Sequence, residues 1–394
     1  TPFGEITEGK LLVYEENLPS RPVAANYRIS DNNITIQLGH YDHSQALIID
    51  PPLSLNWATY YGGAVGAIDG PQTITVDVFS NVYVCGYTAC ADFPTMNGGG
   101  YFDGTNNGGI GDFIIKFNSA GVRQWATYIE GPVSNSPSCI TTDASGNLYM
   151  TGAAHSQNNA IFPVMNPGGG AYYQPASGGW MDPYILKFDA ASNLIWGTFY
   201  GGSGDDEAAS AITTDAAGNV FVTGSTKSTD FPVYNPGGSA YFVGTFPGNA
   251  GGKVGFVLKF NSSCVRQWAT YYGAAWMGSG GRGITTDPSG NIFVIGTTEA
   301  STMPTANPGG GAYYDGTNTL INTSAFLAKF NASTLALQWG TYFGQGGADR
   351  GYSIASDASG NIFAAVTNNG GGMPTANPGG GAYFQGANAG NMDL

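Results

Sequence analysis

A tryptophan-centred segment recurs five times along this chain at nearly constant spacing, and this repetition limits the possible folds more than any other feature. The segments are WATYYGG, WATYIEG, WGTFYGG, WATYYGA and WGTYFGQ, and they begin at Trp57, Trp125, Trp196, Trp268 and Trp339. The period is about 71 residues, and a fixed period of this kind indicates stacked copies of one supersecondary unit. The chain is therefore expected to form one repetitive body rather than several unrelated domains.

Other motifs follow in the same order within each period. An Asp-containing turn leads into a strand-like run such as NVFVTGST, then a Phe-Pro or Met-Pro step, a glycine-rich loop such as NPGGGAYY, and an alternating run such as GFVLKFN. Aspartate can bond to the backbone of its own turn and glycine accepts a positive φ, so D-x-x-G-N predicts a tight hairpin. We assign a structural role to the recurring turn aspartates Asp143, Asp215, Asp287 and Asp357.

Each period offers four short strands, which predicts an all-β fold, a β-propeller of four-stranded antiparallel blades. The blade units begin near residues 54, 125, 196, 268 and 339, so five repeats are visible and the last is incomplete. The long glycine-rich loop lies between the second and third strands of each unit. The five repeat tryptophans, Trp57, Trp125, Trp196, Trp268 and Trp339, are expected to pack between the sheets.

The two ends of the chain depart from the repeat. Residues 1–53 contain strand signals without the motifs, and we expect either the end of a preceding β-rich domain or a strap on the first blade. Residues 54–394 form the propeller. The segment at Trp57 is predicted to be an outermost strand without inner strands, whereas the fifth repeat has inner strands only. Either five blades close through a shared blade, or further repeats belong to the ring.

Composition excludes several functions. The formal net charge is −14 and only 10% of the residues are charged, so a phosphate backbone would be repelled and nucleic acid is not an expected partner. No apolar run reaches the length of about 18 residues that a membrane-spanning helix needs. The four cysteines show no metal-ligand spacing. A disulfide between Cys85 and Cys90 and a pair of inert buried thiols both remain possible readings of CGYTAC.

Motifs for catalysis are lacking in the sequence, so no catalytic residue is assigned and the protein is expected not to be an enzyme. The acidic run Asp205, Asp206 and Glu207 offers oxygen ligands to calcium, without the regular spacing of a known calcium loop. The alternative is a solvated loop, and no other cofactor is expected. The lysines of the F-x-x-K-F runs, Lys116, Lys187, Lys259 and Lys329, are expected to be exposed members of alternating strands.

An aromatic pair closes each glycine-rich loop. In one interpretation, one ring of each pair anchors the loop between blades; in the other, exposed rings form a repeated platform for sugar rings or a protein partner. The candidate ligand-binding residues are Tyr101 and Phe102, Tyr172 and Tyr173, Tyr241 and Phe242, Tyr313 and Tyr314, and Tyr383 and Phe384.

The motif series W-x-T-Y-x-G-G, I-T-x-D-x-x-G-N, F-P-T and F-I-x-K-F-N resembles the SBBP family of bacterial β-propeller repeats, from about Ser54 to Leu394. The resemblance implies a secreted or cell-surface protein, as found in Bacteroidota, in which many such proteins pass through type IX secretion. We therefore expect a non-enzymatic scaffold for adhesion that binds extracellular polysaccharide or surface and secretion proteins. The alternatives are a structural component or cargo of the secretion pathway, and a carbohydrate-active enzyme with acids at the propeller channel.

Overall fold

The computed structural model describes two compact units, residues 1–60 and 61–394. The described residues are 12–15, 18–30, 33–43, 47–50, 57–64, 68–107, 109–129, 135–204, 208–248, 251–276, 279–318, 323–344, 348–369, 373–376 and 385. The boundary between the two units, after residue 60, lies seven residues beyond the boundary after residue 53 that the sequence motifs predict.

The first unit contains two small antiparallel sheets. Strands β1 (Leu12–Glu15), β2 (Leu18–Val23) and β5 (Leu47–Asp50) form one sheet in the order β2-β1-β5, and β3 (Ala25–Ser30) pairs with β4 (Asn33–Leu38). Val13 and Val23 are buried in this unit. Its small core is consistent with the short, β-rich segment that the sequence predicts.

The second unit contains four four-stranded antiparallel sheets and one two-stranded sheet among its described residues. Strand order follows chain order in each sheet, so neighbouring strands are joined as hairpins. The four-stranded antiparallel sheets that the motifs predict are confirmed. The blade number of the complete ring and its closure remain predictions.

The strands of the first two sheets are β6 (Asp69–Val76), β7 (Val82–Thr88), β8 (Gly111–Phe117) and β9 (Arg123–Ile129), followed by β10 (Ser136–Thr142), β11 (Leu148–His155), β12 (Met181–Phe188) and β13 (Leu194–Phe199). A 3-10 turn, η1 (Ser156–Asn158), follows β11. The next two sheets contain β14 (Ala208–Thr214), β15 (Val220–Thr226), β16 (Lys253–Phe260) and β17 (Arg266–Trp276), and then β18 (Gly280–Thr286), β19 (Ile292–Thr298), β20 (Ser324–Phe330) and β21 (Leu337–Phe343). The last sheet pairs β22 (Arg350–Ser356) with β23 (Ile362–Thr367).

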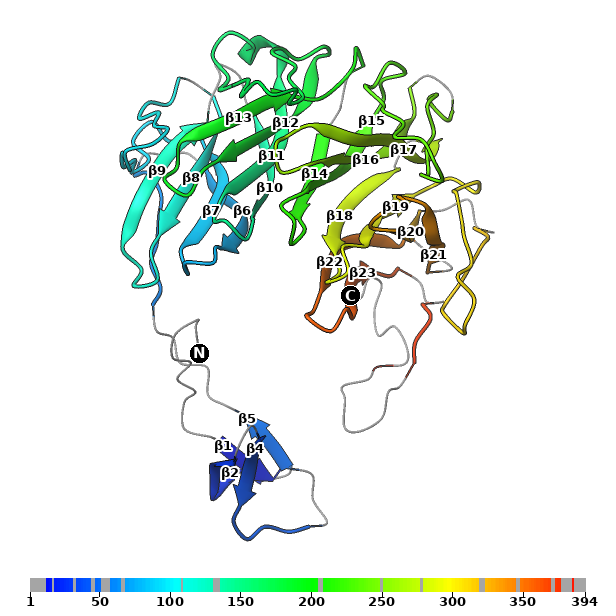
Figure 1. The fold of residues 1–394 in the computed structure, drawn as a ribbon. Coiled ribbons are helices and arrows are strands. Elements are labelled where there is room, and N and C mark those ends of the chain that lie inside the picture. The colour runs from blue at the N-terminus through cyan, green and yellow to red at the C-terminus, as the bar shows by residue number, and fades with distance from the viewer. Residues whose placement is uncertain are drawn as a thin grey trace. The chain divides into compact units, whose positions relative to one another are not determined.

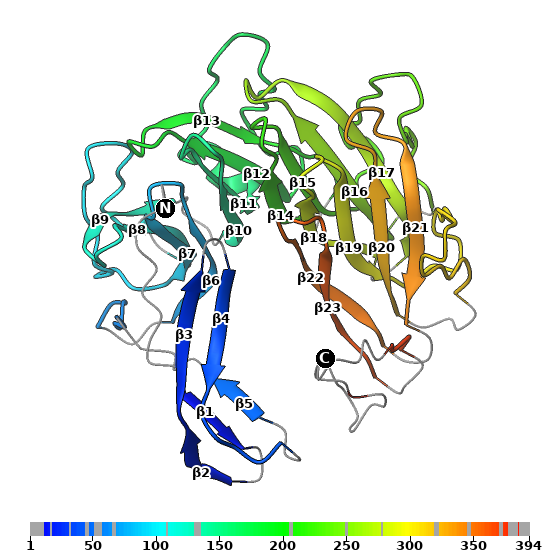
Figure 2. The same cartoon turned by 60° about the horizontal axis from the view of Figure 1, so that its bottom comes forward.

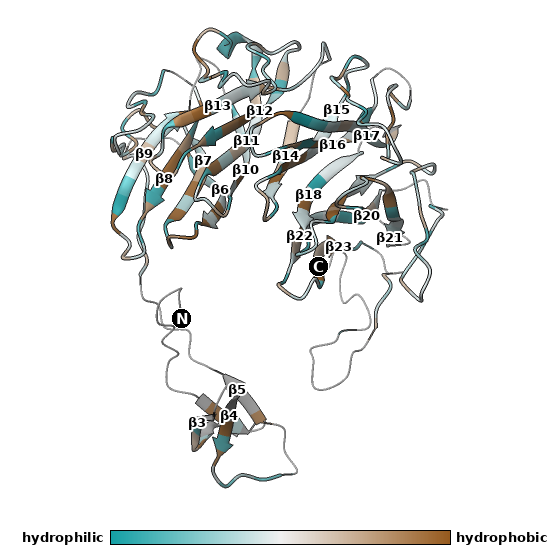
Figure 3. Ribbon diagram, viewed as in Figure 1, coloured by the Kyte–Doolittle hydropathy of each residue, from teal (hydrophilic) through white to brown (hydrophobic). Residues whose placement is uncertain are grey.

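The sheets of this unit follow one another in an arc, with the first strand of each sheet on the inner side (Figures 1 and 2). First strands of successive sheets are in contact. Apolar residues are concentrated on the central strands of a sheet, as on β7 and β8 (Figure 3), because these strands face neighbours on both sides. The core therefore lies between sheets, in a series of separate junctions.

A ladder of side-chain hydrogen bonds joins the first strands. The hydroxyl of Thr142 donates to the carbonyl of Val76 at 3.1 Å, and Thr214 donates to the carbonyl of Thr142 at 3.0 Å. Thr286 and Ser356 continue the series, each donating to the preceding member. Val76 occupies the same position in the first sheet and has no hydroxyl, so the ladder begins there.

The Asp-containing turns have the geometry expected from their residues. In the second sheet, Oδ1 of Asp143 accepts from the backbone N–H groups of Ser145 and Asn147, and Oδ2 accepts from the Asn147 side chain. Gly146 has φ 78° at the position that requires a left-handed residue. The same contacts recur around Asp215, Asp287 and Asp357.

One Asp-containing turn has serine instead of glycine at its left-handed position, and this difference supports a stability prediction. Ser80 has φ 62° where the other four turns carry glycine, and a left-handed conformation costs a non-glycine residue about 1–2 kcal/mol. Glycine also loses more backbone entropy on folding, so we expect Ser80→Gly to raise the free energy of unfolding by about 0.5–1 kcal/mol, measured by urea denaturation. Gly360→Ser, at φ 83° in an open site, should lower it; stabilisation by this reverse change would contradict the argument.

The repeat tryptophans divide into two groups. Trp125, Trp196 and Trp268 are fully buried and Trp339 is half-buried. Trp57 is 48% exposed, and residues 57–63 form no strand. These residues belong to none of the described sheets, so the prediction of an outermost strand at Trp57 is wrong for the described residues.

The structure also answers two further expectations, one on the lysines and one on the cysteines. The lysines are not exposed: Lys187 is buried, its Nζ donates to the carbonyl of Ser262 in the next sheet at 3.0 Å, and it lies 5.2 Å from the ring of Tyr149. Lys116 and Lys259 make the equivalent contacts. All four cysteines are free thiols, which excludes the bridge between Cys85 and Cys90 in this structure.

Candidate functional site

The glycine-rich loops project from the outer edges of the sheets. In the first four sheets, the loop first pairs with the outer strand of its own sheet through a single bridge, such as Met165 to Gly197. The side chain of Asn166 then accepts from the N–H of Gly168 at 2.8 Å, and Gly168, Gly169 and Gly170 all have positive φ. A Cβ built on any of these glycines would meet no atom within 4 Å. The loop tip is therefore an open solvent-facing turn.

In the first three sheets, the first ring of the aromatic pair lies in a junction with the next sheet. The N–H of Tyr172 donates to the carbonyl of Cys264 in the next sheet, and Nε1 of Trp196 donates to the carbonyl of Tyr172 at 2.8 Å. The Tyr172 ring lies 4.6 Å from Tyr200 and 6.2 Å from Phe260. Tyr101 and Tyr241 make the corresponding contacts with Phe188 and Phe330, and Tyr313 packs on Phe343.

The second ring of each pair lies further out. Phe102 and Tyr314 are exposed, whereas Tyr173 and Phe242 are half-buried. Tyr383 and Phe384 lie outside the described residues. The first ring thus anchors the loop in the first three sheets, whereas the second ring is exposed in the first and fourth sheets.

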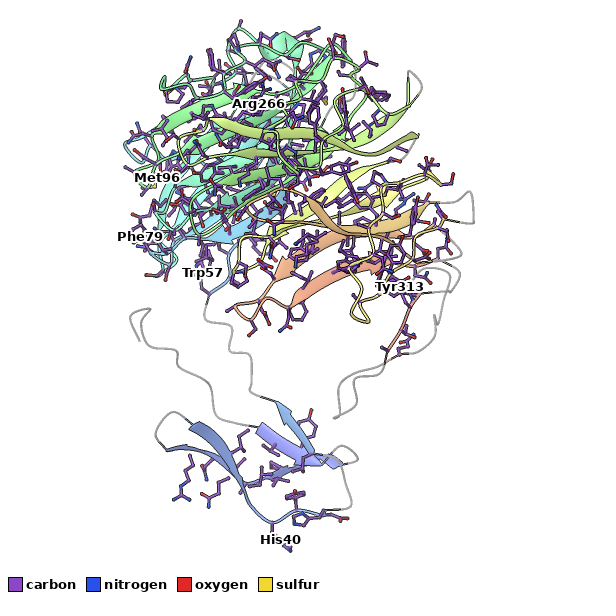
Figure 4. All side chains as sticks on the ribbon, turned by 45° about the vertical axis from the view of Figure 1, so that its right-hand side comes forward. His40, Trp57, Phe79, Met96, Arg266 and Tyr313 are labelled. Carbon is purple, nitrogen blue, oxygen red and sulfur yellow. The ribbon has the colours of Figure 1, made fainter. Side chains whose placement is uncertain are left out.

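These loops also carry exposed apolar side chains that were not among the candidate residues predicted from the sequence. The residue before the loop asparagine is exposed in three sheets, and its signal in the sequence is its fixed place before N-P-G-G or N-G-G. We define the outer-rim residues as Met96, Phe102, Met165, Tyr234 and Tyr314. Figure 4 places Met96 at the outer edge of the fold. Single apolar residues are ordinary on a surface, but their repetition at equivalent loop positions makes them candidates for binding a ligand.

An arginine stiffens this rim in two sheets. The guanidinium carbon of Arg266 lies 4.9 Å from the ring of Tyr172 and 5.2 Å from the ring of Tyr234, and Figure 4 shows Arg266 among the loops. Its Nη1 also donates to the hydroxyl of Tyr200 and the carbonyl of Pro232. Arg123 makes the equivalent contacts in the first sheet. The shared V-R-Q-W sequence at both positions is a signal that could have identified them.

A cavity of about 500 Å³ lies among the Asp-containing turns of the third, fourth and last sheets rather than at the glycine-rich loops. Asp215, Asp287, Asp357 and Lys259 line it. Each aspartate already accepts from two backbone N–H groups and one asparagine side chain of its own turn. These hydrogen bonds lower the pKa of Asp357. A carboxylate held in the ionised form, as at Asp357, is poorly suited to act as a general acid.

The candidate calcium ligands Asp205, Asp206 and Glu207 lie outside the described residues. Within the part of the chain that the structure describes, no three or more histidine, cysteine, aspartate or glutamate side chains gather closely enough to hold a metal ion. The same part contains no helix long and apolar enough to cross a membrane.

Asp182, at the start of β12, is a buried carboxylate in the second sheet. Its Oδ2 accepts from the N–H of Gly178 at 2.7 Å, whereas its buried Oδ1 has no hydrogen-bond partner. Burial raises the pKa of Asp182 from 3.8 to about 6, against the opposing hydrogen bond from Gly178. The nearby carboxylate of Asp230 raises the pKa further. Ionised Asp182 therefore destabilises the fold.

This pKa predicts how stability changes with pH. Because the folded-state pKa is above the unfolded one, the contribution of Asp182 is fully present below about pH 4 and is lost as the pH rises through about 6. We expect the free energy of unfolding of Asp182→Asn to be about 2 kcal/mol higher than that of the parent at pH 7.5, since each pKa unit corresponds to about 1.4 kcal/mol. At pH 4 the two free energies of unfolding should be equal. Denaturant titrations at both pH values measure this. An equal effect at both would contradict the assignment.

The repeated hairpins, the inner-strand contacts and the loops between second and third strands define the class as a β-propeller-repeat protein. Residues 56–94, 195–232 and 267–301 match the SBBP family, described as a beta-propeller repeat. The chain therefore carries SBBP repeats. Residues 1–52 match a domain of unknown function, DUF7948.

Three further proteins are similar to this chain at low sequence identity. The chain is 27% identical over 254 residues to an uncharacterized WD repeat-containing protein of Acanthamoeba polyphaga mimivirus, an alignment that covers 59% of this chain and 18% of the relative. A protein of unknown function from Dyadobacter fermentans is similar in structure, with TM-score 0.40, 12% identity and coverage of 78% and 76%. A gluconolactonase from Xanthomonas campestris has TM-score 0.34 and 10% identity, with coverage of 92% and 82%.

Proposed function

We propose that this chain belongs to a secreted or cell-surface bacterial protein and acts as a non-enzymatic scaffold that binds polysaccharide through its outer-rim residues. The observation that supports this is the repeated loop: its first aromatic ring is packed against the sheets, while Phe102 and Tyr314 remain exposed. Aromatic faces held by rigid surroundings suit the flat apolar faces of sugar rings, because little conformational entropy is lost on binding.

The repetition itself favours a polymeric ligand. Equivalent loops recur on successive sheets, so a chain of sugars could contact several loops at once, and binding at one loop raises the effective concentration at the next. The net charge of −14 favours a neutral or cationic polysaccharide over a strongly acidic one, because like charges repel. The Bacteroidota origin and type IX secretion that the resemblance implies belong to the same proposal.

The test is affinity electrophoresis and pull-down of the full chain with cellulose, chitin, xylan and alginate. We expect retention by at least one neutral polysaccharide and roughly tenfold weaker retention of the Phe102→Ala, Met165→Ala, Tyr314→Ala triple variant. The control is Val122→Ala, which removes an exposed apolar side chain in the β8–β9 turn, outside the glycine-rich loops. Retention by no polysaccharide, or equal retention of the triple variant, would reject the outer rim as a sugar site and favour the structural or cargo role.

The rival enzymatic function is supported by one observation, the cavity lined by Asp215, Asp287 and Asp357. The same incubations distinguish it, because hydrolysis releases reducing ends and binding does not. If reducing ends appear and are lost in Asp287→Asn, the scaffold proposal is wrong. The turn contacts described above favour the scaffold, since all three carboxylates are engaged by their own turns.

A further inference from the structure

Every described junction between successive sheets buries the same pair of side chains. The second strand of one sheet contributes an aromatic residue, and the first strand of the next sheet contributes an isoleucine. Four such pairs lie in common clusters: Tyr83 with Ile140, Tyr149 with Ile212, Phe221 with Ile284, and Phe293 with Ile354. All eight side chains are 8% exposed or less.

The first and last sheets carry the two halves of one more such pair on separate surfaces. Ile74 of β6 is equivalent to the four buried isoleucines, yet it is 66% exposed, and the neighbouring Val76 is exposed as well. Phe363 of β23 is equivalent to the four buried aromatic residues, and it is 61% exposed. We call these surfaces the isoleucine face, with Ile74 and Val76, and the phenylalanine face, with Phe363. A sheet face that stays in solvent normally carries polar side chains, and neither face is polar at these positions.

At the outer side of the isoleucine face, Tyr61 makes contacts that elsewhere in the fold occur between neighbouring sheets. The hydroxyl of Tyr61 donates to the carbonyl of Pro94, and Arg123 donates to that hydroxyl at 2.8 Å. The Tyr61 ring lies 5.3 Å from Phe93 and 6.0 Å from Phe117.

The second and third sheets show what this arrangement means. There Tyr200, which follows the outer strand of the preceding sheet, donates to the carbonyl of Pro232 and accepts from Arg266. Its ring lies 5.3 Å from Phe231 and 5.9 Å from Phe260. Tyr61 thus occupies the place of a tyrosine delivered by a preceding sheet. The first sheet is built to receive such a sheet.

We propose that the two faces meet between copies of this chain, so that the phenylalanine face of one copy packs head to tail on the isoleucine face of the next. The occupant is a second copy because the chain itself carries both halves of the recurring pair, and the described structure leaves both halves exposed. Such a contact joins two different surfaces, so it leaves one free face at each end of the assembly and allows further growth. The proposal is independent of polysaccharide binding, which uses the outer-rim residues.

The test is the molar mass of the full chain, measured by light scattering and sedimentation velocity over roughly a hundredfold range of concentration. We expect the mass to rise above the 40.8 kDa of one chain. Ile74→Asp and Phe363→Asp should each prevent this growth. An equimolar mixture of the two variants should form a dimer and nothing larger, because each variant keeps one intact face.

Controls separate this result from misfolding. Both side chains are exposed, so thermal melts of the variants should match the parent, and Val76→Asp provides a second variant of the isoleucine face. Ile161→Asp introduces the same charge at an exposed site in the β11–β12 connection of the second sheet, on neither face, and should assemble like the parent. A parent chain that remains monomeric throughout overturns the proposal, and the faces would then belong to another repeat. Variants that assemble like the parent, or a mixture that stays monomeric, overturn it as well.

Discussion

Replacing Trp196 with alanine should lower the free energy of unfolding by about 3–5 kcal/mol, as expected for a fully buried tryptophan. The ring lies in the junction between the second and third sheets, 5.2 Å from Phe260, and its Nε1 donates to the carbonyl of Tyr172. Alanine would leave a cavity in the junction and an unsatisfied carbonyl at the base of the glycine-rich loop. Urea denaturation followed by tyrosine fluorescence and circular dichroism measures the loss.

The repeat provides a matched control for this variant. Trp57 stands in nearly the same sequence, WATYYGG against WGTFYGG, but it is 48% exposed. We expect Trp57→Ala to change the free energy of unfolding by less than about 1 kcal/mol. Trp196→Phe should fall between the parent and Trp196→Ala, since it keeps most of the packing and loses the hydrogen bond. Equal effects at Trp57 and Trp196 would mean that the motif, rather than the junction, determines the stability.

Replacing Asp143 with alanine should cost about 2–4 kcal/mol, because one carboxylate satisfies four donors in a buried turn. Oδ1 accepts from the N–H groups of Ser145 and Asn147 at 2.9 and 3.0 Å. Oδ2 accepts from Nδ2 of Asn147 at 2.8 Å and from the buried hydroxyl of Tyr149 at 3.0 Å. Without the carboxylate, the hydroxyl would have to be buried without this acceptor. Chemical denaturation at pH 7 gives the difference.

Two comparisons divide this loss into its parts. Tyr149→Phe removes only the hydroxyl donor and should cost about 1 kcal/mol. Asp357→Ala removes the equivalent carboxylate from an exposed turn whose sheet carries Phe363 in place of the tyrosine, so its effect should be clearly smaller. If Asp357→Ala were as damaging as Asp143→Ala, the backbone turn alone would explain the effect and the buried hydroxyl would contribute little.

The hairpins and the order of the strands could be predicted from the sequence because they depend on neighbouring residues. Asp143 and Gly146 specify their turn within five residues, and the runs on either side alternate as strands do. The loop position followed from the same local reading. The junctions could not be predicted in this way, because each one brings together residues about 70 positions apart.

The candidate site was predictable only in part, for the same reason. Sequence analysis identified the aromatic pairs but could not choose between an anchor and a platform. The structure assigns Tyr172 to a junction by its hydrogen bond to Cys264, and it leaves Phe102 exposed. Lys187 was expected on the surface because its strand alternates, yet its amine reaches the carbonyl of Ser262 in the next sheet.

By itself, the sequence determined the repeat, the four strands of each unit, the turn chemistry and the acidic character that disfavours nucleic acid. Only the tertiary structure decided which copies of a repeated residue are buried. Ile74 and Ile140 occupy the same place in equivalent motifs, yet one is exposed and the other is buried. Backbone conformation depends mainly on the local chain, whereas burial depends on whether another sheet packs on that face, and only the arrangement of whole sheets determines this.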